Sequence, residues 1–333
     1  MKRSSSTKGR RGSSALPMLA SAFRAFRMNP VSWLIVGLII VLSSLYPKSF
    51  LSATNLVSIL KGFAITSMLS IGPTLVVLMG SLDLSYMGIW MFGGALVWLL
   101  FPHLGLLAII IYPIFGLMVG LFNGIVQVKT KIPSFILTLA VTAVFAYLTT
   151  VIRNISGVLT LAVPEYGFLT KSPIPYLPMP FLLALPVIFI TFFLMSFTRV
   201  GTYLSAIGSN EEGAELAGIN VQKYKILGFA ASGFITGLGS IALYSYLGCR
   251  APVTLDLNEL VRGLAAIVLG GTPLVGGVGG PHRTLLGALA YVLIFNGLFL
   301  AGIDPNQFKL YIGVVLVVAV LMASRVLKGV LIA

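Results

Sequence analysis

The chain has 333 residues, of which 58% are hydrophobic and only 9% are charged, and its mean hydropathy is +1.03. About a quarter of the residues of a soluble domain are charged, so this composition excludes a water-soluble globule. The formal net charge of +14 would suit a nucleic-acid binder, but seven of the 22 bases lie in the first 27 positions, where they predict the orientation of a membrane protein. We therefore expect an all-α polytopic membrane protein whose surroundings are a lipid bilayer, with no nucleic-acid partner.

Apolar runs near twenty residues long recur along the chain, and each could cross about 30 Å of hydrocarbon as a helix. They predict a basic cytoplasmic tail at 1–30 and a transmembrane domain at 31–328 with about ten spans. The expected spans are 31–46, 56–79, 86–101, 105–128, 133–152, 180–197, 225–247, 259–280, 284–302 and 309–325. Few bases fall in the segments that this topology assigns to the outside, so we expect both termini in the cytoplasm.

Two regions depart from clean spans. Boundaries are weak at 80–85, and glycines and prolines accumulate at 259–284, which favours a broken or re-entrant helix as the alternative to a full span. The longest outside connection, at 153–179, carries four prolines and is long enough to form a small external platform.

Glycine spacing predicts how the helices pack. Gly116, Gly120 and Gly124 lie four residues apart, as do Gly233 and Gly237, so each set forms a small-residue stripe for close packing within the chain. Phe-Asn-Gly occurs at 122–124 and again at 295–297, in two spans expected to be antiparallel. This repetition is compatible with an inverted repeat.

A short polar stretch, "IGSNEEGAELAGINVQKYKI" at 207–226, holds three of the eight acidic residues. Ser209 followed by Glu212 predicts a capping box, and Gly218 lies where a helix would end. Glu211 and Glu215 share one face of this predicted cytoplasmic helix, and Ala214 and Ala217 offer small surfaces for another protein. From spacing alone, a solvated connector is an equally good interpretation.

The pattern at 208–220 resembles the cytoplasmic coupling motif of permease subunits in ATP-binding-cassette (ABC) importers. It is most similar to the ribose-type monosaccharide branch, which includes ribose, xylose, galactose and autoinducer-2 systems. "GSLDLS" at 80–85, "GLFNGIVQVKTKIPSFILTLA" at 120–140 and "AAIVLGGTPLVGGVGGPHRTLLGAL" at 265–289 extend the resemblance to roughly residues 50–325. Ser81, Leu82, Leu137, Ala140 and the run 281–283 depart from the family pattern, which leaves the solute open.

The resemblance implies a type II-like ABC importer permease in the bacterial inner membrane. The partners it implies are an ABC ATPase, a second permease subunit (identical or homologous) and an external solute-binding protein. The helix at 209–218 would dock on the ATPase through Asn210, Glu211, Glu212, Ala214, Glu215 and Gly218. The glycine-rich run at 270–280 lacks the Gly-Lys-Ser/Thr ending of a P-loop, so we expect no enzyme activity and no cofactor in this chain, with ATP and Mg bound by the ATPase.

Polar residues in otherwise apolar spans are candidates for the translocation path: Asp83, Asn123, Thr138, Thr272 and Asn296. For Asp83, a path role and a helix cap are equally favoured. The uncharged residues suit a neutral polyhydroxylated solute, although for any one of them an interhelical hydrogen bond is the stronger interpretation. Lys61 and Arg262 are expected to snorkel or to pair with polar neighbours.

Other function classes have less support from the sequence. Cys249 is the single cysteine, so we expect neither an intrachain disulfide nor a cysteine metal site. An ion-coupled secondary transporter would need membrane acids or a histidine relay, yet His103 and His282 fall at span ends on opposite sides. A permease for nucleosides or branched-chain amino acids in a related importer is the remaining alternative. No constellation of residues favours a membrane enzyme or receptor.

Overall fold

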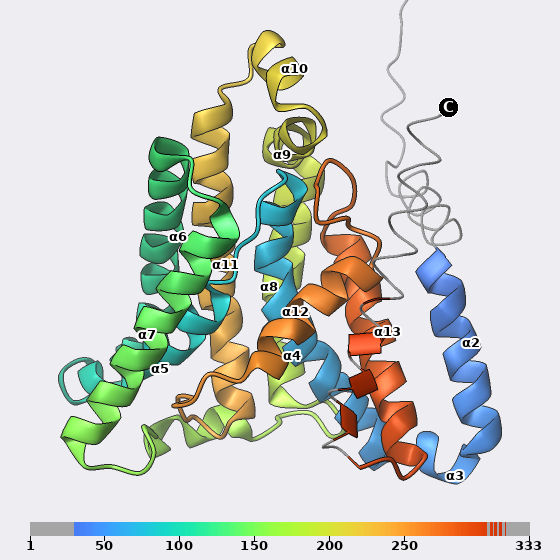
Figure 1. Cartoon of the computed structure of the whole chain (residues 1–333). Coiled ribbons are helices and arrows are strands. Elements are labelled where there is room, and N and C mark those ends of the chain that lie inside the picture. Colours follow the sequence, from blue (N-terminus) through green and yellow to red (C-terminus); the bar gives the residue numbers. More distant parts are fainter. Residues whose placement is uncertain (1–29, 305–306, 309, 312, 315–316, 318–333) are drawn as a thin grey trace, which may run out of the picture.

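The computed structural model describes residues 30–304, 307–308, 310–311, 313–314 and 317. Within these residues the regular elements are helices, with two isolated β-bridges and no strand, so the predicted all-α fold is confirmed (Figure 1). The predicted tail at 1–30 and most of the predicted span at 309–325 lie outside the described residues.

Eight of the ten predicted spans correspond to long apolar helices in this part of the chain. They are α2 (Pro30–Leu45), α4 (Ala53–Leu78), α5 (Tyr86–Leu104), α6 (Ile111–Thr130), α7 (Ser134–Ser156), α8 (Met179–Phe197), α11 (Val221–Tyr246) and α13 (Pro281–Leu300). The 3₁₀ helix η1 (Gly105–Ile110) joins α5 to α6. The shorter elements are α3 (Pro47–Phe50), η2 (Pro164–Thr170), α9 (Arg199–Ser209), α10 (Glu211–Leu216) and α12 (Leu257–Leu269).

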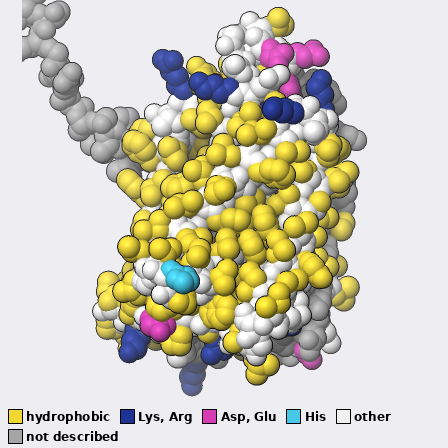
Figure 2. All heavy atoms as spheres, turned by 90° about the vertical axis from the view of Figure 1, so that its left-hand side faces the viewer, with side chains coloured by type: hydrophobic (Ala, Val, Ile, Leu, Met, Phe, Trp, Pro, Cys, Tyr) yellow, Lys and Arg dark blue, Asp and Glu magenta, His cyan; other side chains and the backbone are white. Residues whose placement is uncertain are grey.

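The surface is divided as a bilayer requires. Figure 2 shows a broad hydrophobic band around the middle of one face, with most of the Lys, Arg, Asp and Glu side chains above and below it. By length and composition, six helical segments of the described chain could each cross a membrane, the segment Tyr86–Thr130 being counted as one. Because water-exposed proteins do not carry such a band, the chain is a multi-pass membrane protein.

The predicted span at 259–280 is wrong as a full span. Only α12 is helical, and its 13 residues reach about 20 Å, well short of the hydrocarbon thickness. Residues 270–280 form an irregular loop in which five glycines have positive φ, from +80° to +138°. Residues with a Cβ atom disfavour positive φ, so the glycines allow the chain to leave the helix and fold back.

Helices α4 and α11 form the centre of the bundle. Each has 26 residues, and about three-quarters of the apolar window of α4 is buried. On its other side α11 packs against α6, where a Cβ atom on Gly116 would lie 2.1 Å from the carbonyl oxygen of Gly233. The predicted glycine stripes are therefore an intramolecular contact.

The helix order agrees with the suggested inverted repeat. Helices α4 and α11 run in opposite directions, and each ends at a glycine with positive φ, Gly80 and Gly248, before an extended segment (Figure 1). The two Phe-Asn-Gly tripeptides lie on α6 and α13, which are 20 residues each and also run in opposite directions.

The long connection after α7 lies at the opposite end of the molecule from α10 (Figure 1). It begins at 157 rather than 153, because α7 continues through Arg153 to Ser156. The buried Tyr166 of η2 donates its hydroxyl hydrogen to the carbonyls of Gly105 and Leu106, 3.3 and 3.1 Å away. The predicted platform is thus a folded element attached to the bundle.

Candidate functional site

Three polar residues start three consecutive helices at one end of the molecule. Thr198 caps α9, Asn210 caps α10 and Asn220 caps α11, each accepting a backbone N–H from the first turn that follows. The predicted capping box at Ser209 is wrong, because Ser209 is the last residue of α9. Asn210 takes its place and accepts from the Gly213 amide at 3.0 Å.

The predicted helix end at Gly218 is confirmed. Gly218 has φ +83°, and its amide donates to the Glu215 carbonyl, while the Ile219 amide donates to that of Ala214. This pair of bonds is the Schellman pattern, which stabilises a helix end only where a residue tolerates positive φ. Helix α10 is therefore capped at both ends, by Asn210 and at Gly218.

The junction of α9 and α10 contacts two distant parts of the bundle directly. A Cβ atom on Gly208 would lie 1.9 Å from the Leu78 carbonyl oxygen, at the end of α4, and 2.6 Å from the Gly277 amide nitrogen. The Ser209 hydroxyl lies 3.4 Å from the Gly277 carbonyl, which it faces across the contact. A displacement of α10 would therefore reach α4 and the 270–280 loop through backbone contacts.

The six predicted coupling residues do not all face outward. Glu211, Glu212 and Glu215 are exposed, and the Glu211 carboxylate also forms an ion pair with Lys225 of α11 at 2.6 Å. Ala214 is only 5% exposed and packs in the chain's own core, so the expectation that it offers a surface to another protein is wrong. Its burial holds α10 against the bundle.

Sequence analysis missed an apolar residue beside these acids. Leu216, the last residue of α10, is 90% exposed and lies at the end of the molecule, away from the hydrophobic band. An open depression of about 380 Å³ lies next to it, lined in part by Glu215, Ile219 and Gln222. Helical spacing could not identify Leu216, because the exposed side of so short a helix depends on how it docks.

Asp83 lies between α4 and α5 and is 1% exposed. Its Oδ1 accepts from the amide and the hydroxyl of Ser85, at 2.9 and 2.5 Å, and its Oδ2 accepts from the Ser232 hydroxyl at 2.8 Å. A buried carboxylate needs such partners. These contacts form a tight turn from Asp83 to Ser85, the residue that precedes α5, and a link to α11. No side-chain hydrogen bond caps α5 at Ser85, so the cap interpretation is not confirmed.

Thr138 belongs to a ladder of hydroxyl groups on α7. Its hydroxyl accepts from the Leu84 amide at 3.0 Å, Ser134 accepts from the Leu82 amide at 2.8 Å, and Thr142 donates to the Leu84 carbonyl at 2.7 Å. These residues are four apart, so they share one face of the helix. They satisfy the backbone of the non-helical segment 81–84.

The other predicted path residues lie in separate places. Thr272 accepts from the Gly280 amide at 3.2 Å and closes the glycine-rich loop. Asn296 of α13 exchanges two amide hydrogen bonds with Asn55 of α4, at 2.6 and 3.2 Å. Asn123 is fully buried, and both its amide atoms lack partners among the described residues. The five predicted path residues therefore do not form one site.

The structure adds a second acid within the bundle. Glu259 of α12 pairs with Arg262 at 2.9 Å, which confirms the expectation that Arg262 pairs with a polar neighbour. Among the described helices, Asp83 is therefore not the only acid that lies inside the bundle. The i,i+3 spacing of Glu259 and Arg262 was the available signal.

Comparison with known proteins places this arrangement in a family. A family model described as "Branched-chain amino acid transport system / permease component" matches residues 55–320. The ribose import permease protein RbsC of Bacillus subtilis is 33% identical across 86% of this chain and 90% of the relative. The RbsC protein of Haemophilus influenzae is 28% identical, covering 89% and 93% respectively.

A more distant relative is the xylose/arabinose import permease protein XylH of Sulfolobus acidocaldarius, 27% identical across 87% of this chain and 83% of the relative. No solved structure gives a significant match. The family model covers most of the chain, including nearly all of α4, the α9–α10 junction and α12–α13. The chain belongs to the permease family that this model describes.

Proposed function

We propose that this chain is the permease subunit of an ATP-driven ABC importer that moves a monosaccharide or similar neutral polyhydroxylated solute into the cell. The observation that carries the proposal is the α9–α10 junction. A short, capped, acidic helix stands at one end of the bundle, and backbone contacts connect it to α4 and the 270–280 loop. A partner that moves α10 would thereby move the bundle.

The partners are proposed from the permease family to which the chain belongs. An ABC ATPase, which holds ATP and Mg, docks on α10 and closes when it binds nucleotide. A second permease subunit completes the path, and a solute-binding protein delivers cargo at the end that carries η2. The protein lies in the bacterial inner membrane with both termini in the cytoplasm, and transport proceeds by alternating access.

The relatives' names support a sugar as the solute, since ribose, xylose and allose permeases are among them. The description of the family model keeps branched-chain amino acids as a second candidate. Ion coupling has less support. Asp83 accepts three hydrogen bonds and Glu259 is paired with Arg262, so each of these two acids already has partners within the chain.

Reconstitution in proteoliposomes tests the proposal. The chain, its ATPase and its binding protein are assayed with D-ribose, D-xylose, D-allose, adenosine and L-leucine, with and without ATP. We expect ATP-dependent uptake of one of the sugars, lost when either partner is omitted. Uptake of leucine or adenosine alone would establish the alternative solute class, and uptake by the isolated chain under an ion gradient would overturn the proposal.

A further inference from the structure

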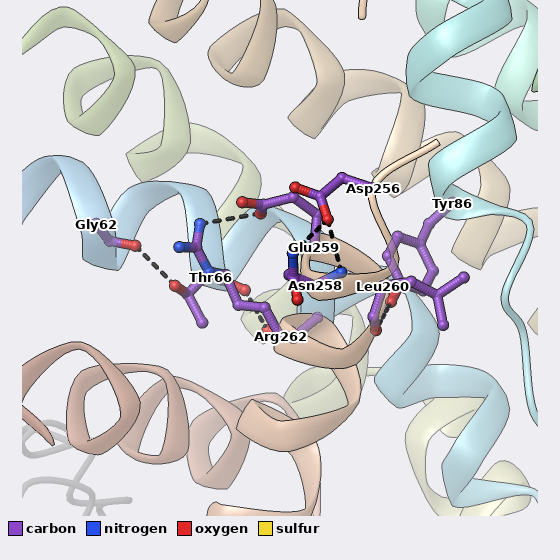
Figure 3. A network of polar contacts seen from close by, with 9 residues as sticks. Gly62, Thr66, Tyr86, Asp256, Asn258, Glu259, Leu260 and Arg262 are labelled. Atoms are coloured by element: carbon purple, nitrogen blue, oxygen red, sulfur yellow. Dashed lines mark hydrogen bonds and ion pairs between the residues drawn. The ribbon is translucent and has the colours of Figure 1, made fainter. Parts of the chain in front are cut away.

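Helix α12 carries charged side chains at the level of the middle of the neighbouring spans α13 and α4. The Arg262 guanidinium lies 5.7 Å from the centre of the Tyr291 ring. Tyr291 is midway along α13, about 15 Å from either end. Figure 3 shows the same region beside Gly62 and Thr66, near the centre of α4. Arg262 and its partner Glu259 therefore lie far from both membrane surfaces.

The packed face of α12 points the other way. The Tyr86 hydroxyl donates to the Leu260 carbonyl, and a Cβ atom on Gly263 would lie 2.8 Å from that hydroxyl oxygen (Figure 3). Since successive helical residues are about 100° apart, Asn258 and Arg262 lie on roughly the opposite side from Leu260. The side chains of Glu259 and Arg262 keep 24% and 28% of their surface accessible.

Partial exposure of this pair is informative because lipid is a poor environment for charge. A charged side chain at the bilayer centre costs at least about 2.5 kcal/mol, so such groups face the bundle interior or a water-filled cavity. Phe189 of α8, at 69% exposure, is an example of the apolar side chains that face outward from other spans, whereas Lys61, beside Gly62 on α4, is a second exposed charged residue. Asp256 and Asn258, joined by a 2.7 Å hydrogen bond, extend the charged pair into a larger polar surface.

We infer that the α12 polar face, formed by Asp256, Asn258, Glu259 and Arg262, lines the aqueous translocation path and binds the solute's hydroxyl groups. A carboxylate accepts and a guanidinium donates, whereas a sugar hydroxyl does both, so the pair offers complementary partners to neighbouring hydroxyls. With Asp256 included, the face carries one net negative charge, and within it the Glu259–Arg262 pair is internally neutralised, which suits hydrogen bonding to a neutral solute. This inference rests on the proposed function and names the part of the chain that contacts its cargo.

Cysteine labelling tests whether water reaches the α12 polar face, and the experiment needs neither solute nor ATPase. In a Cys249→Ser background, Asn258→Cys and Phe189→Cys are exposed to a quaternary-ammonium methanethiosulfonate in right-side-out and inverted vesicles. Cys249 is buried and donates to the Tyr166 carbonyl, a bond that serine retains. We expect Asn258→Cys to react at least about tenfold faster than Phe189→Cys in one orientation, although Phe189 is geometrically the more exposed position.

Uptake assays on the complete transporter test the contact with solute. Glu259→Gln and Arg262→Gln are compared with the unmodified chain. The solute is the one that the unmodified chain transports in the proteoliposome assay described above. We expect each variant to lower uptake about tenfold, because each loses a charge-assisted hydrogen bond to the solute. The amount of protein in the membrane and its co-purification with the ATPase should stay unchanged.

Two results would overturn the inference. Equal, slow labelling of both cysteines would mean that lipid or protein covers the α12 polar face. Uptake within twofold of the unmodified chain in both glutamine variants would mean that the pair does not contact solute. Failure of the proposed function would be different: ATP-independent uptake in the unmodified chain, whatever the labelling rates.

Discussion

The Gly277 amide donates a 2.9 Å hydrogen bond to the carbonyl of Leu78, the last residue of α4. Gly208, at the end of α9, lies against the same carbonyl. One backbone oxygen thus joins the end of α4, the 270–280 loop and the segment that leads into α10. This junction is the physical connection between α10 and the region of α12 and the 270–280 loop, and substitutions can test how much change it tolerates.

Gly208→Ala should disrupt this junction. The new Cβ atom would lie 1.9 Å from the Leu78 carbonyl oxygen and 2.6 Å from the Gly277 nitrogen, both backbone atoms that a side-chain rotation cannot move. Overpacking of this kind costs about 1–3 kcal/mol. We expect a lower apparent Tm of the detergent-solubilised protein, together with reduced ATP-dependent uptake. Gly167→Ala is the matched control, because nothing lies within 4 Å of its Cβ position. Equal Tm values for the two variants would contradict the described contact.

Thr138→Val should destabilise the protein through the backbone of residue 84. Valine preserves the shape of threonine but removes the oxygen that the Leu84 amide uses. A buried amide without an acceptor costs about 1–3 kcal/mol. The control is Thr149→Val on the same helix, since the buried Thr149 hydroxyl bonds only the Phe145 carbonyl of its own helix. Thermal unfolding should show a larger loss for Thr138→Val. Unchanged stability combined with lost uptake would instead support a path role for Thr138.

Two substitutions of Asp83 distinguish the structural role of its hydrogen bonds to Ser85 and Ser232 from a role of its negative charge in transport. Asp83→Asn retains an oxygen for Ser85 and gains a donor for the Ser232 oxygen, so we expect near-normal stability and uptake. Asp83→Leu removes every acceptor and should cost about 1–3 kcal/mol for each buried donor left unpaired. The measurements are apparent Tm and ATP-dependent uptake. A stable Asp83→Asn variant without uptake would show that the negative charge itself is needed for transport.

Apolar run length predicted most of the fold because a helix that crosses hydrocarbon must be continuous and apolar. The eight confirmed helices satisfy that condition. Residues 270–280 are also largely apolar or glycine, so hydropathy extended the span through them. Two of the five glycines with positive φ, Gly276 and Gly277, pack against the end of α4 and against α9, as the hydrogen bond from Gly277 to Leu78 illustrates. A tertiary contact of this kind leaves no periodic signal in the sequence.

The coupling segment was predictable to within one residue because caps are local. Ser209 and Asn210 are both good N-cap residues, and local rules do not choose between them. The choice depends on Ser209, which stays in α9 and faces Gly277. The same limit applies to Ala214, whose burial depends on the docking of α10. Likewise, the spacing of Glu259 and Arg262 indicates an ion pair, but their mid-membrane depth follows only from α12 being a half-length helix.

Substitutions of exposed residues on α10 should distinguish an effect on ATPase docking from an effect on the folding of the chain. Glu212 is exposed, with no ion pair among the described residues, and Leu216 is 90% exposed, so Glu212→Lys and Leu216→Asp disturb no internal contact. We expect both variants to keep the apparent Tm of the unmodified chain but to lose co-purification with the ATPase, and uptake with it. Glu211→Lys should in addition lose about 1 kcal/mol, because it replaces the ion pair with Lys225 by a repulsion.

The control for these variants is Glu165→Lys, a charge reversal on the exposed surface of η2 at the other end of the molecule. It should leave ATPase binding intact. The double change Glu211→Lys with Glu212→Lys should abolish uptake completely, since it removes both acids of the first turn of α10. Normal uptake and intact co-purification in that double variant would show that the ATPase does not bind the acidic face of α10. The ATPase would then have to contact a different surface of the chain in order to move the Leu78–Gly277 junction.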